Sequence, residues 1–294
     1  MTTANLTVPS AKISLIRQVT RWISRWKTFT VGLLITVVFV TGTLLAPWIA
    51  PYAPDKTDYD HRFASPNMHH LMGTDAHGRD IFSRILYGGR VSLYVSFFAV
   101  SLSALMGVPI GLTTGFFGGW YDTVVSRIVD AMFAFPGILW SISIVTILGP
   151  SANSAMLALA VARVPVTIRI ARASIVSAKE NEYVDASRAL GSSWPFIIFR
   201  AILPNCAGPI VVLVSLGFPV TILAEAGLSY LGLSVQPPTP SWGNLIQDSQ
   251  RYLYESIWYS LFPGLSLFLA VLGLNLVGDG VRDLFDPRHN QRQS

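Results

Sequence analysis

Charged side chains are absent from five long windows of the chain. They run over residues 28–54, 91–121, 131–162, 201–224 and 256–278. The hydrocarbon core of a bilayer takes about 20 helical residues to cross, and each window is long enough. The windows do not alternate between apolar and polar residues, as the strands of a membrane barrel do. The pattern therefore predicts membrane-spanning helices.

A turn signal from Gly149 to Asn153 divides the third window in two. The fifth span is expected to continue past Glu225. Six spanning helices are then expected, over about residues 29–50, 91–116, 124–148, 153–176, 204–231 and 257–279. The predicted fold class is an all-α polytopic membrane protein, with one permease domain over residues 29–280 and an inner loop over residues 177–203.

Lysine and arginine set the expected orientation of these helices. With the N-terminus in the cytoplasm, fifteen of the 21 basic residues fall in inner segments and six in outer loops. Cytoplasmic loops of membrane proteins collect such residues, so both termini are predicted to be cytoplasmic: residues 1–28 as an N-terminal segment and 281–294 as a tail. The first apolar stretch is too long for a signal peptide and is interpreted as an uncleaved anchor.

Composition agrees with a membrane location. Hydrophobic residues make up 51% of the 294 residues and charged residues 13%, against roughly 25% charged residues in a soluble domain. This excludes a soluble globular enzyme, a disordered protein and a basic nucleic-acid binder. The net charge of +5 is explained by the inner loops, and the single cysteine, Cys206, excludes an internal disulfide.

The inner loop has a helix–glycine–helix pattern. Alternating charges with alanine and leucine over residues 179–190 suit a short helix outside the bilayer, and Gly191 stands where such a helix ends in the left-handed conformation. A second amphipathic stretch covers residues 194–202, and Pro204 begins the next span. Two interpretations stay open here: a solvated connector, or a knob presented to a cytoplasmic partner.

The loop resembles the EAA loop of ABC importer permeases. That loop has the form Glu-Ala-Ala, three residues, Gly, nine residues, Ile, one residue, Leu-Pro. Asp185-Ala186-Ser187 stands for the triplet, Gly191 and Leu203-Pro204 are in register, and Ala201 replaces the isoleucine. The resemblance implies that this loop couples the permease to its ATPases. The residues to which it assigns that role are Glu182, Tyr183, Asp185, Ala186, Arg188, Leu190 and Gly191.

Six further motifs resemble the dipeptide/oligopeptide/nickel permease group, most closely its second, C-type permease. They occupy residues 71–84, 87–93, 118–122, 225–233, 238–243 and 275–283. The outer-loop residues carried over from the first motif are Gly73, Thr74, Asp75, Gly78, Arg79, Asp80 and Arg84. The implied fold is the type I ABC importer transmembrane domain in a prokaryotic inner membrane.

The resemblance also implies partners. These are a second homologous permease in a heterodimer, two cytoplasmic ABC ATPases that bind ATP and Mg, an extracytoplasmic solute-binding protein, and membrane lipids; no nucleic acid is expected. The implied function is ATP-driven import of di- or oligopeptides, with nickel, glutathione or another small solute as the alternative. The rival from another class is an ion-coupled secondary transporter, which is less favoured because the span centres are nearly charge-free.

No catalytic site is expected in this chain, nor a cofactor bound by it. None of the four lysines follows a glycine, which excludes a P-loop. Residues 227–231 fail the Gly-x-Ser-x-Gly pattern at the last position. Four histidines share one outer loop with several aspartates: His61, His69, His70 and His77. Imidazole and carboxylate can bind a transition metal, but the spacing is irregular, so a polar loop is favoured and no metal site is predicted.

Ionisable groups within the spans leave alternatives open. Glu225, with Ser229 one turn later, is expected near the outer end of the fifth span. It either lines the translocation path or gate, or pairs with an outer-loop arginine. Arg163, Arg169 and Arg172 are expected on the inner part of the fourth span, where they anchor the helix at lipid phosphates or face a second permease.

Overall fold

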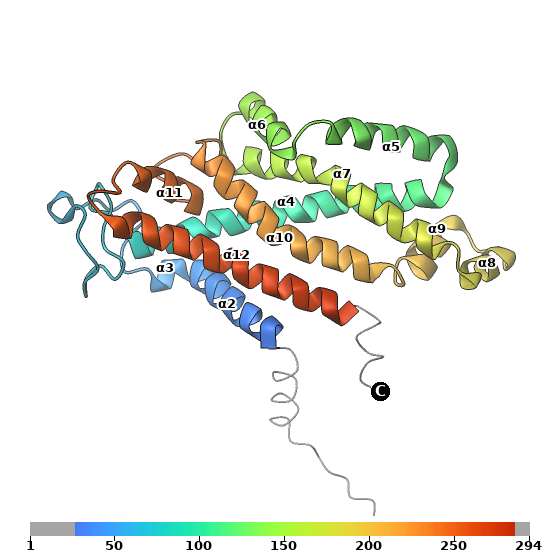
Figure 1. The fold of residues 1–294 in the computed structure, drawn as a ribbon, viewed down its shortest axis with the longest axis horizontal. Helices are drawn as coiled ribbons and strands as arrows, with labels where there is room; N and C mark the ends of the chain where they lie inside the picture. The colour runs from blue at the N-terminus through green and yellow to red at the C-terminus, as the bar shows by residue number, and fades with distance from the viewer. Residues whose placement is uncertain (1–26, 286–294) are drawn as a thin grey trace, which may run out of the picture.

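The computed structural model describes residues 27–285. Expectations for residues 1–26 and 286–294 lie outside this range. Within it the elements are helices joined by loops (Figure 1). They are α2 Lys27–Leu44, α3 Ala46–Ile49, η1 Tyr59–His61, α4 Ile81–Phe117, α5 Gly119–Phe133, α6 Gly137–Leu148, α7 Ala152–Ala178, α8 Glu182–Ala189, α9 Trp194–Phe196, η2 Ile197–Ile202, α10 Ala207–Tyr230, α11 Trp242–Gln250 and α12 Ile257–Phe285.

Five of the described helices are long and apolar enough to cross a membrane: α2, α4, α7, α10 and α12. The pair α5 and α6 provides a sixth span only if it is counted as one broken helix, because the two are bent by 85°. The prediction of one straight helix over residues 124–148 is therefore wrong. Pro136 explains the break, since proline lacks a backbone donor and keeps the preceding residue out of the helical region.

α4 begins at Ile81, well before the expected start at residue 91. The charged residues Arg84 and Arg90 lie before the apolar window and set that expected start. The helix passes through them because Asp80 caps its N-terminus, accepting a hydrogen bond from the backbone N–H of Ser83 at 2.8 Å. α12 likewise continues past residue 279 to Phe285. The expected helix over 29–50 is divided into α2 and α3, and Pro47 lies in the first turn of α3.

Close packing of α4 against α7 forms the centre of the bundle. Gly107, Gly111 and Gly115 lie four residues apart on one face of α4. A Cβ atom on any of them would lie closer than 3.0 Å to atoms of α7. Glycine at this spacing lets two helix backbones approach closely, as in other membrane helix pairs.

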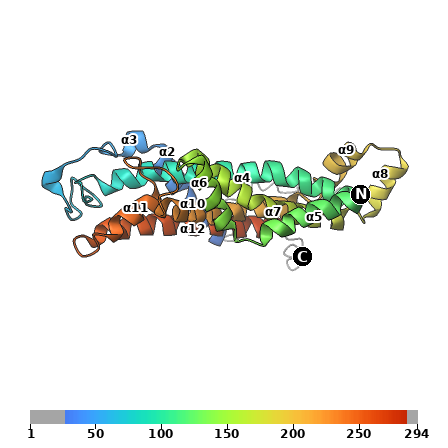
Figure 2. The same ribbon diagram turned by 90° about the horizontal axis from the view of Figure 1, so that it is seen from above.

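The two ends of the molecule differ. The loop over residues 51–80 and α11 lie at one end of the long axis, and α8 and α9 lie at the other end in both views (Figures 1 and 2). Each end has its own apolar cluster. Trp242 and Tyr259 belong to the cluster at the α11 end, and Val184 and Ile198 to the cluster at the α8 end.

Candidate functional site

α8 is held against the bundle by one apolar residue. Val184 is fully buried and packs in a cluster with Leu112 of α4, Ile175 of α7 and Ile198 of η2. The rest of the helix projects from the end of the bundle (Figure 1). The sequence analysis did not name Val184, although a lone β-branched residue between charged ones was the available signal.

The turn after α8 is closed by a Schellman motif. The N–H of Gly191 donates to the carbonyl of Arg188 at 2.9 Å, and the N–H of Ser192 donates to the carbonyl of Ser187 at 3.1 Å. This pair of bonds requires a left-handed residue between them, and Gly191 has φ +75°. The exposed side chain of Leu190, 85% accessible, therefore lies at the tip of the knob.

The seven residues predicted to couple this chain to ATPases lie together on that knob. All of them are exposed: Glu182, Tyr183, Asp185, Ala186, Arg188, Leu190 and Gly191. Arg188 and Asp185 approach to 3.4 Å, but an exposed pair of this kind contributes little to stability. The surface thus combines charged groups with an apolar tip, and the described part of the chain leaves it uncovered.

Polar contacts connect the knob to the helices that carry it. Lys179 donates from Nζ to the carbonyl of Gly115 at 2.9 Å, in the last turn of α4, where a cation is favoured by the helix dipole. Arg172 forms a bidentate pair with Asp122 of α5, at 2.5 and 2.6 Å. Arg169 pairs with Asp130 of α5 at 2.8 Å. These two arginines thus have partners within the chain, while 55% of the Arg169 side chain and 38% of the Arg172 side chain stay exposed.

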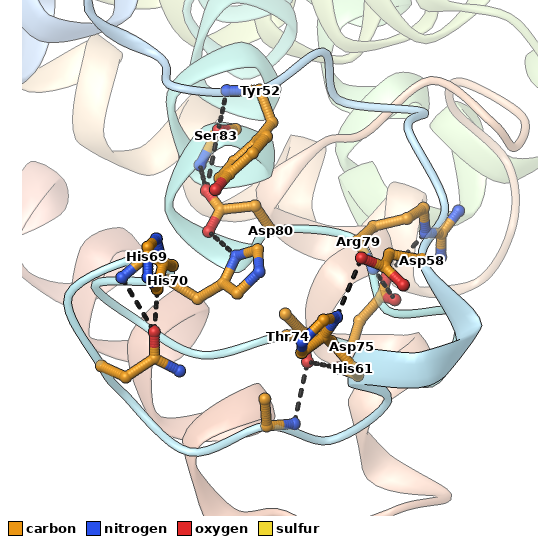
Figure 3. A network of polar contacts seen from close by, with 12 residues as sticks. Tyr52, Asp58, His61, His69, His70, Thr74, Asp75, Arg79, Asp80 and Ser83 are labelled. Atoms are coloured by element: carbon orange, nitrogen blue, oxygen red, sulfur yellow. Dashed lines mark hydrogen bonds and ion pairs between the residues drawn. The ribbon is translucent and has the colours of Figure 1, made fainter.

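The outer loop is organised by Asp75, which is fully buried (Figure 3). Its Oδ1 accepts from the backbone N–H groups of His77 at 2.7 Å and Arg79 at 2.9 Å. Its Oδ2 accepts from Arg79 Nε at 2.6 Å and lies 3.6 Å from Arg84 Nε. One carboxylate therefore neutralises two buried guanidinium groups and fixes the turn between them.

Asp80, at the end of the same loop, has a comparable role. Besides capping α4, its Oδ2 accepts from the Ser83 hydroxyl at 2.7 Å, and its Oδ1 accepts from His70 Nδ1 at 2.9 Å (Figure 3). Thr74 closes the loop by accepting from Ala64 N–H at 2.8 Å and donating to the carbonyl of His61.

The remaining predicted outer-loop residues support the same scaffold. Gly73 and Gly78 have φ +77° and +72°, and a Cβ at either would collide with a carbonyl, of Ala64 and Asp58 respectively. Arg84 donates to the carbonyl of Pro54 at 3.0 Å. All seven outer-loop residues of the motif thus lie in one folded unit. This arrangement points to a rigid platform on the outer end of the bundle.

Trp242 of α11 locks this platform to the bundle. It is the largest fully buried side chain, and its indole N–H donates to the carbonyl of Ile85 at 3.1 Å. The sequence analysis quoted Trp242 only as part of a motif. Asp248, on the same helix, lines a cavity of about 400 Å³ with Arg79 and Tyr259. Burial raises the pKa of the Asp248 carboxyl, and the charges of Arg84 and Arg79 oppose that shift.

The outer-loop histidine side chains with partners within the loop are those of His61, His70 and His77. His61 donates to Asp58 at 2.9 Å, which lowers the pKa of the Asp58 carboxyl, and His77 accepts from Arg79 at 3.2 Å. Across residues 27–285 there is no group of three or more His, Cys, Asp or Glu side chains arranged to hold a metal ion.

Glu225 and Ser229 are both fully buried in α10. Glu225 Oε1 accepts from the hydroxyl of Ser234 at 3.1 Å, and Oε2 has no hydrogen-bond partner in the part of the chain that the structure describes. Ser229 shares a hydrogen bond with Ser241 at the start of α11. The alternative that Glu225 pairs with an outer-loop arginine is wrong, because its contacts among the described residues are with hydroxyl groups and not with a cation. Neither side chain opens onto a cavity surface in this conformation.

Comparison with known proteins identifies the fold and the family. Residues 107–291 match the family model of the binding-protein-dependent transport system inner membrane component, and residues 14–66 match the N-terminal TM domain of oligopeptide transport permease C. A chain of the MetNI methionine ABC transporter, solved in inward-facing conformations, superimposes with a TM-score of 0.58 at 18% identity, over 69% of this chain and 96% of that one. This likeness shows the fold of an ABC importer transmembrane domain.

Curated relatives match over nearly the whole length. The dipeptide transport system permease protein DppC of Alkalihalophilus pseudofirmus is 43% identical over 92% of this chain and 90% of its own. The di/tripeptide permease DppC of Pseudomonas aeruginosa is 38% identical over 87% of each chain. The glutathione permease GsiD of Escherichia coli is 36% identical over 92% and 91%. The chain therefore belongs to the family of inner membrane components of binding-protein-dependent transport systems, as a multi-pass permease of the C type.

Proposed function

We propose that this chain is one permease subunit of an ATP-driven importer of di- and oligopeptides. It forms the translocation path with a second, homologous permease. Two cytoplasmic ATPases bind ATP and Mg, and an extracytoplasmic binding protein delivers the solute. The peptide assignment is supported by relatives named for dipeptides and di/tripeptides. The relative named for glutathione is consistent with it, because glutathione is itself a small peptide.

The observation that carries the coupling role is the exposed knob of α8. It presents an apolar tip and charged flanks, and it is joined to α4 through Lys179 and to α7 through the Val184 cluster. Force applied to the tip therefore reaches the two most closely packed helices of the bundle. Binding ATP moves the equilibrium only if the ATPases bind one conformation of the permease more tightly than the other.

The proposed orientation follows from this role. The knob and both chain termini face the cytoplasm, and the platform built on Asp75 faces the binding protein. Since the platform is cross-linked by buried ion pairs, it offers the binding protein a preformed surface. Solute then passes between the permeases rather than through this chain alone.

Replacing Gly191 by Trp tests the coupling role. No atom of the described residues lies within 4 Å of a Cβ built at Gly191, and the positive φ adds about 1–2 kcal/mol of local strain. Gly232→Trp is the matched control, because Gly232 closes the same kind of Schellman motif after α10, with φ +75° and no atom of the described residues within 4 Å of a Cβ built there. We expect normal insertion of both variants, with peptide uptake and peptide-stimulated ATP hydrolysis lost only in Gly191→Trp. Wild-type uptake by an inserted Gly191→Trp variant would exclude the coupling role.

The solute is tested by uptake of labelled di- and tripeptides in cells with and without this gene. The binding protein and ATPases are left in place. Loss of ATP-dependent uptake on deletion supports the proposal. Unchanged peptide uptake would refute it and make nickel the next solute to test, whereas uptake that persists without ATP would favour an ion-coupled transporter.

A further inference from the structure

One arginine at the middle of the bundle has no hydrogen-bond or ion-pair partner among the described residues. Arg163 is close to the centre of α7, and its guanidinium faces Gly217, close to the centre of α10. Arg163 was expected among the basic residues of the inner side. The structure instead places it about 17 Å from the start of α7, at 1.5 Å per residue.

The guanidinium makes no hydrogen bond or ion pair with any residue of the described range 27–285. Its Nε is buried without an acceptor. Its two neighbours on α7, Arg169 and Arg172, differ in this respect because each has an aspartate of α5. No charged side chain of the described range acts on the charge of the Arg163 guanidinium. The effect of its surroundings is to remove that charge from water by burial.

The Arg163 guanidinium occupies space that is free because residue 217 is a glycine. A Cβ on Gly217 would collide with the guanidinium, so glycine at this position provides the space it occupies. The guanidinium borders a cavity of about 180 Å³ between α6, α7 and α10, lined by Ser141, Thr221 and apolar side chains. Val220 and Ile138 beside the cavity are 61% and 41% exposed, so it opens on the flank of the chain.

An unpaired charge at this depth is costly, and such residues in membrane proteins mark substrate pathways or partner contacts. The group that satisfies a guanidinium best is a carboxylate, whose two oxygens match its planar fork of donors. A solute peptide carries one carboxylate at its C-terminus whatever its side chains are. The mostly apolar lining of the cavity does not select among those side chains.

From this geometry we propose that Arg163 binds the C-terminal carboxylate of the peptide during its passage through the membrane. This rests on the proposed function, that the solute is a peptide. The cavity is smaller than a dipeptide, so it receives the carboxylate end and leaves the rest of the solute in the space between the two permeases. An acidic side chain of the second permease would supply the same chemistry, and the experiment separates the two sources.

The test uses the complete transporter in liposomes, with ATP inside and the binding protein outside. The probes are labelled Ala-Ala and its C-terminal amide, each at a concentration that saturates the binding protein. Arg163→Met and Arg163→Lys are compared with wild type for each probe, so any preference of the binding protein cancels. Thermal unfolding and co-purification of the two permeases are measured on the same samples.

We expect Arg163→Met to lower the rate for Ala-Ala about ten-fold or more, the factor given by the loss of one hydrogen-bonded charge pair. The transport rate of Arg163→Met for the amide should differ from the wild-type rate for the amide by less than about two-fold. Arg163→Lys should recover part of the Ala-Ala rate, and pairing of the permeases should be unaffected.

Three results would overturn the inference. One is an unchanged Ala-Ala rate in Arg163→Met, and another is an equal loss for both probes. The third is loss of the second permease on purification, which would assign the guanidinium to an acidic side chain of that partner. If the wild-type complex transports neither probe, the proposed peptide function fails instead.

Discussion

Replacement of Asp75 by Asn tests whether the outer platform depends on its buried charges. The asparagine keeps the shape of the side chain and its acceptor for the two backbone N–H groups. It removes the negative charge from Arg79 and Arg84, whose side chains are 10% and 2% exposed. Removing one member of a buried ion pair costs about 3–5 kcal/mol, because the other member stays buried without compensation.

The assay is thermal unfolding of the permease pair in detergent, followed by reaction of a thiol dye with Cys206. This is the single cysteine of the chain and it is 3% exposed, so it reacts when the bundle opens. The partner permease is made cysteine-free. We expect Asp75→Asn to unfold several degrees below wild type, and Asp75→Asn with Arg79→Met to recover part of that loss.

Asp58→Asn is the matched control. Asp58 also pairs with a basic side chain of the outer loop, but that pair is exposed on both sides, with 60% and 43% of the two side chains accessible. We expect its midpoint to equal that of wild type. An Asp75→Asn protein that unfolds with the wild-type midpoint, or an Asp58→Asn protein that loses as much, would refute the reasoning from burial.

Two further predictions concern α11. Trp242→Phe removes the hydrogen bond to Ile85 and some buried volume, so unfolding should become easier by about 1–3 kcal/mol, and Trp242→Ala should cost about 3–5 kcal/mol in the same assay; equal midpoints for the two variants would contradict this. Because burial raises the pKa of Asp248, the folded state holds its proton more tightly than the unfolded state, and stability therefore rises as the pH falls toward about 4. Asp248→Asn should raise the midpoint at pH 7 and flatten that dependence, whereas a lower midpoint at pH 7 would show that the carboxylate is needed to neutralise Arg84.

The coupling loop illustrates what a local pattern can predict. A short charged helix ended by Gly191 was predicted from residue spacing, and the structure has α8 over Glu182–Ala189 with Gly191 in the left-handed conformation. Both features depend on bonds between residues a few positions apart. The coupling role itself stays a prediction.

The outer loop illustrates the opposite case. Its motif residues were identified, but the sequence analysis gave no reason for Asp75, Arg79 and Arg84 to occur together. Their role comes from one buried carboxylate facing two guanidinium groups. The error in the start of α4 has the same cause, because a charged residue ends a membrane span in a hydropathy pattern unless a tertiary partner neutralises it.

The class of the protein follows from the charge-free windows longer than 20 residues, because only helices and closed barrels span a bilayer and these windows do not alternate as barrel strands do. The sequence by itself also determined the position of the coupling loop and the family to which the motifs pointed. Only the tertiary structure decided which charges are paired. Asp122 and Arg172 lie 50 positions apart in the chain yet form a bidentate pair. Arg163 precedes Arg172 on the same helix and has no partner among the described residues. Pairing depends on which helices meet and at what depth, and that follows from packing of the whole bundle rather than from any local pattern.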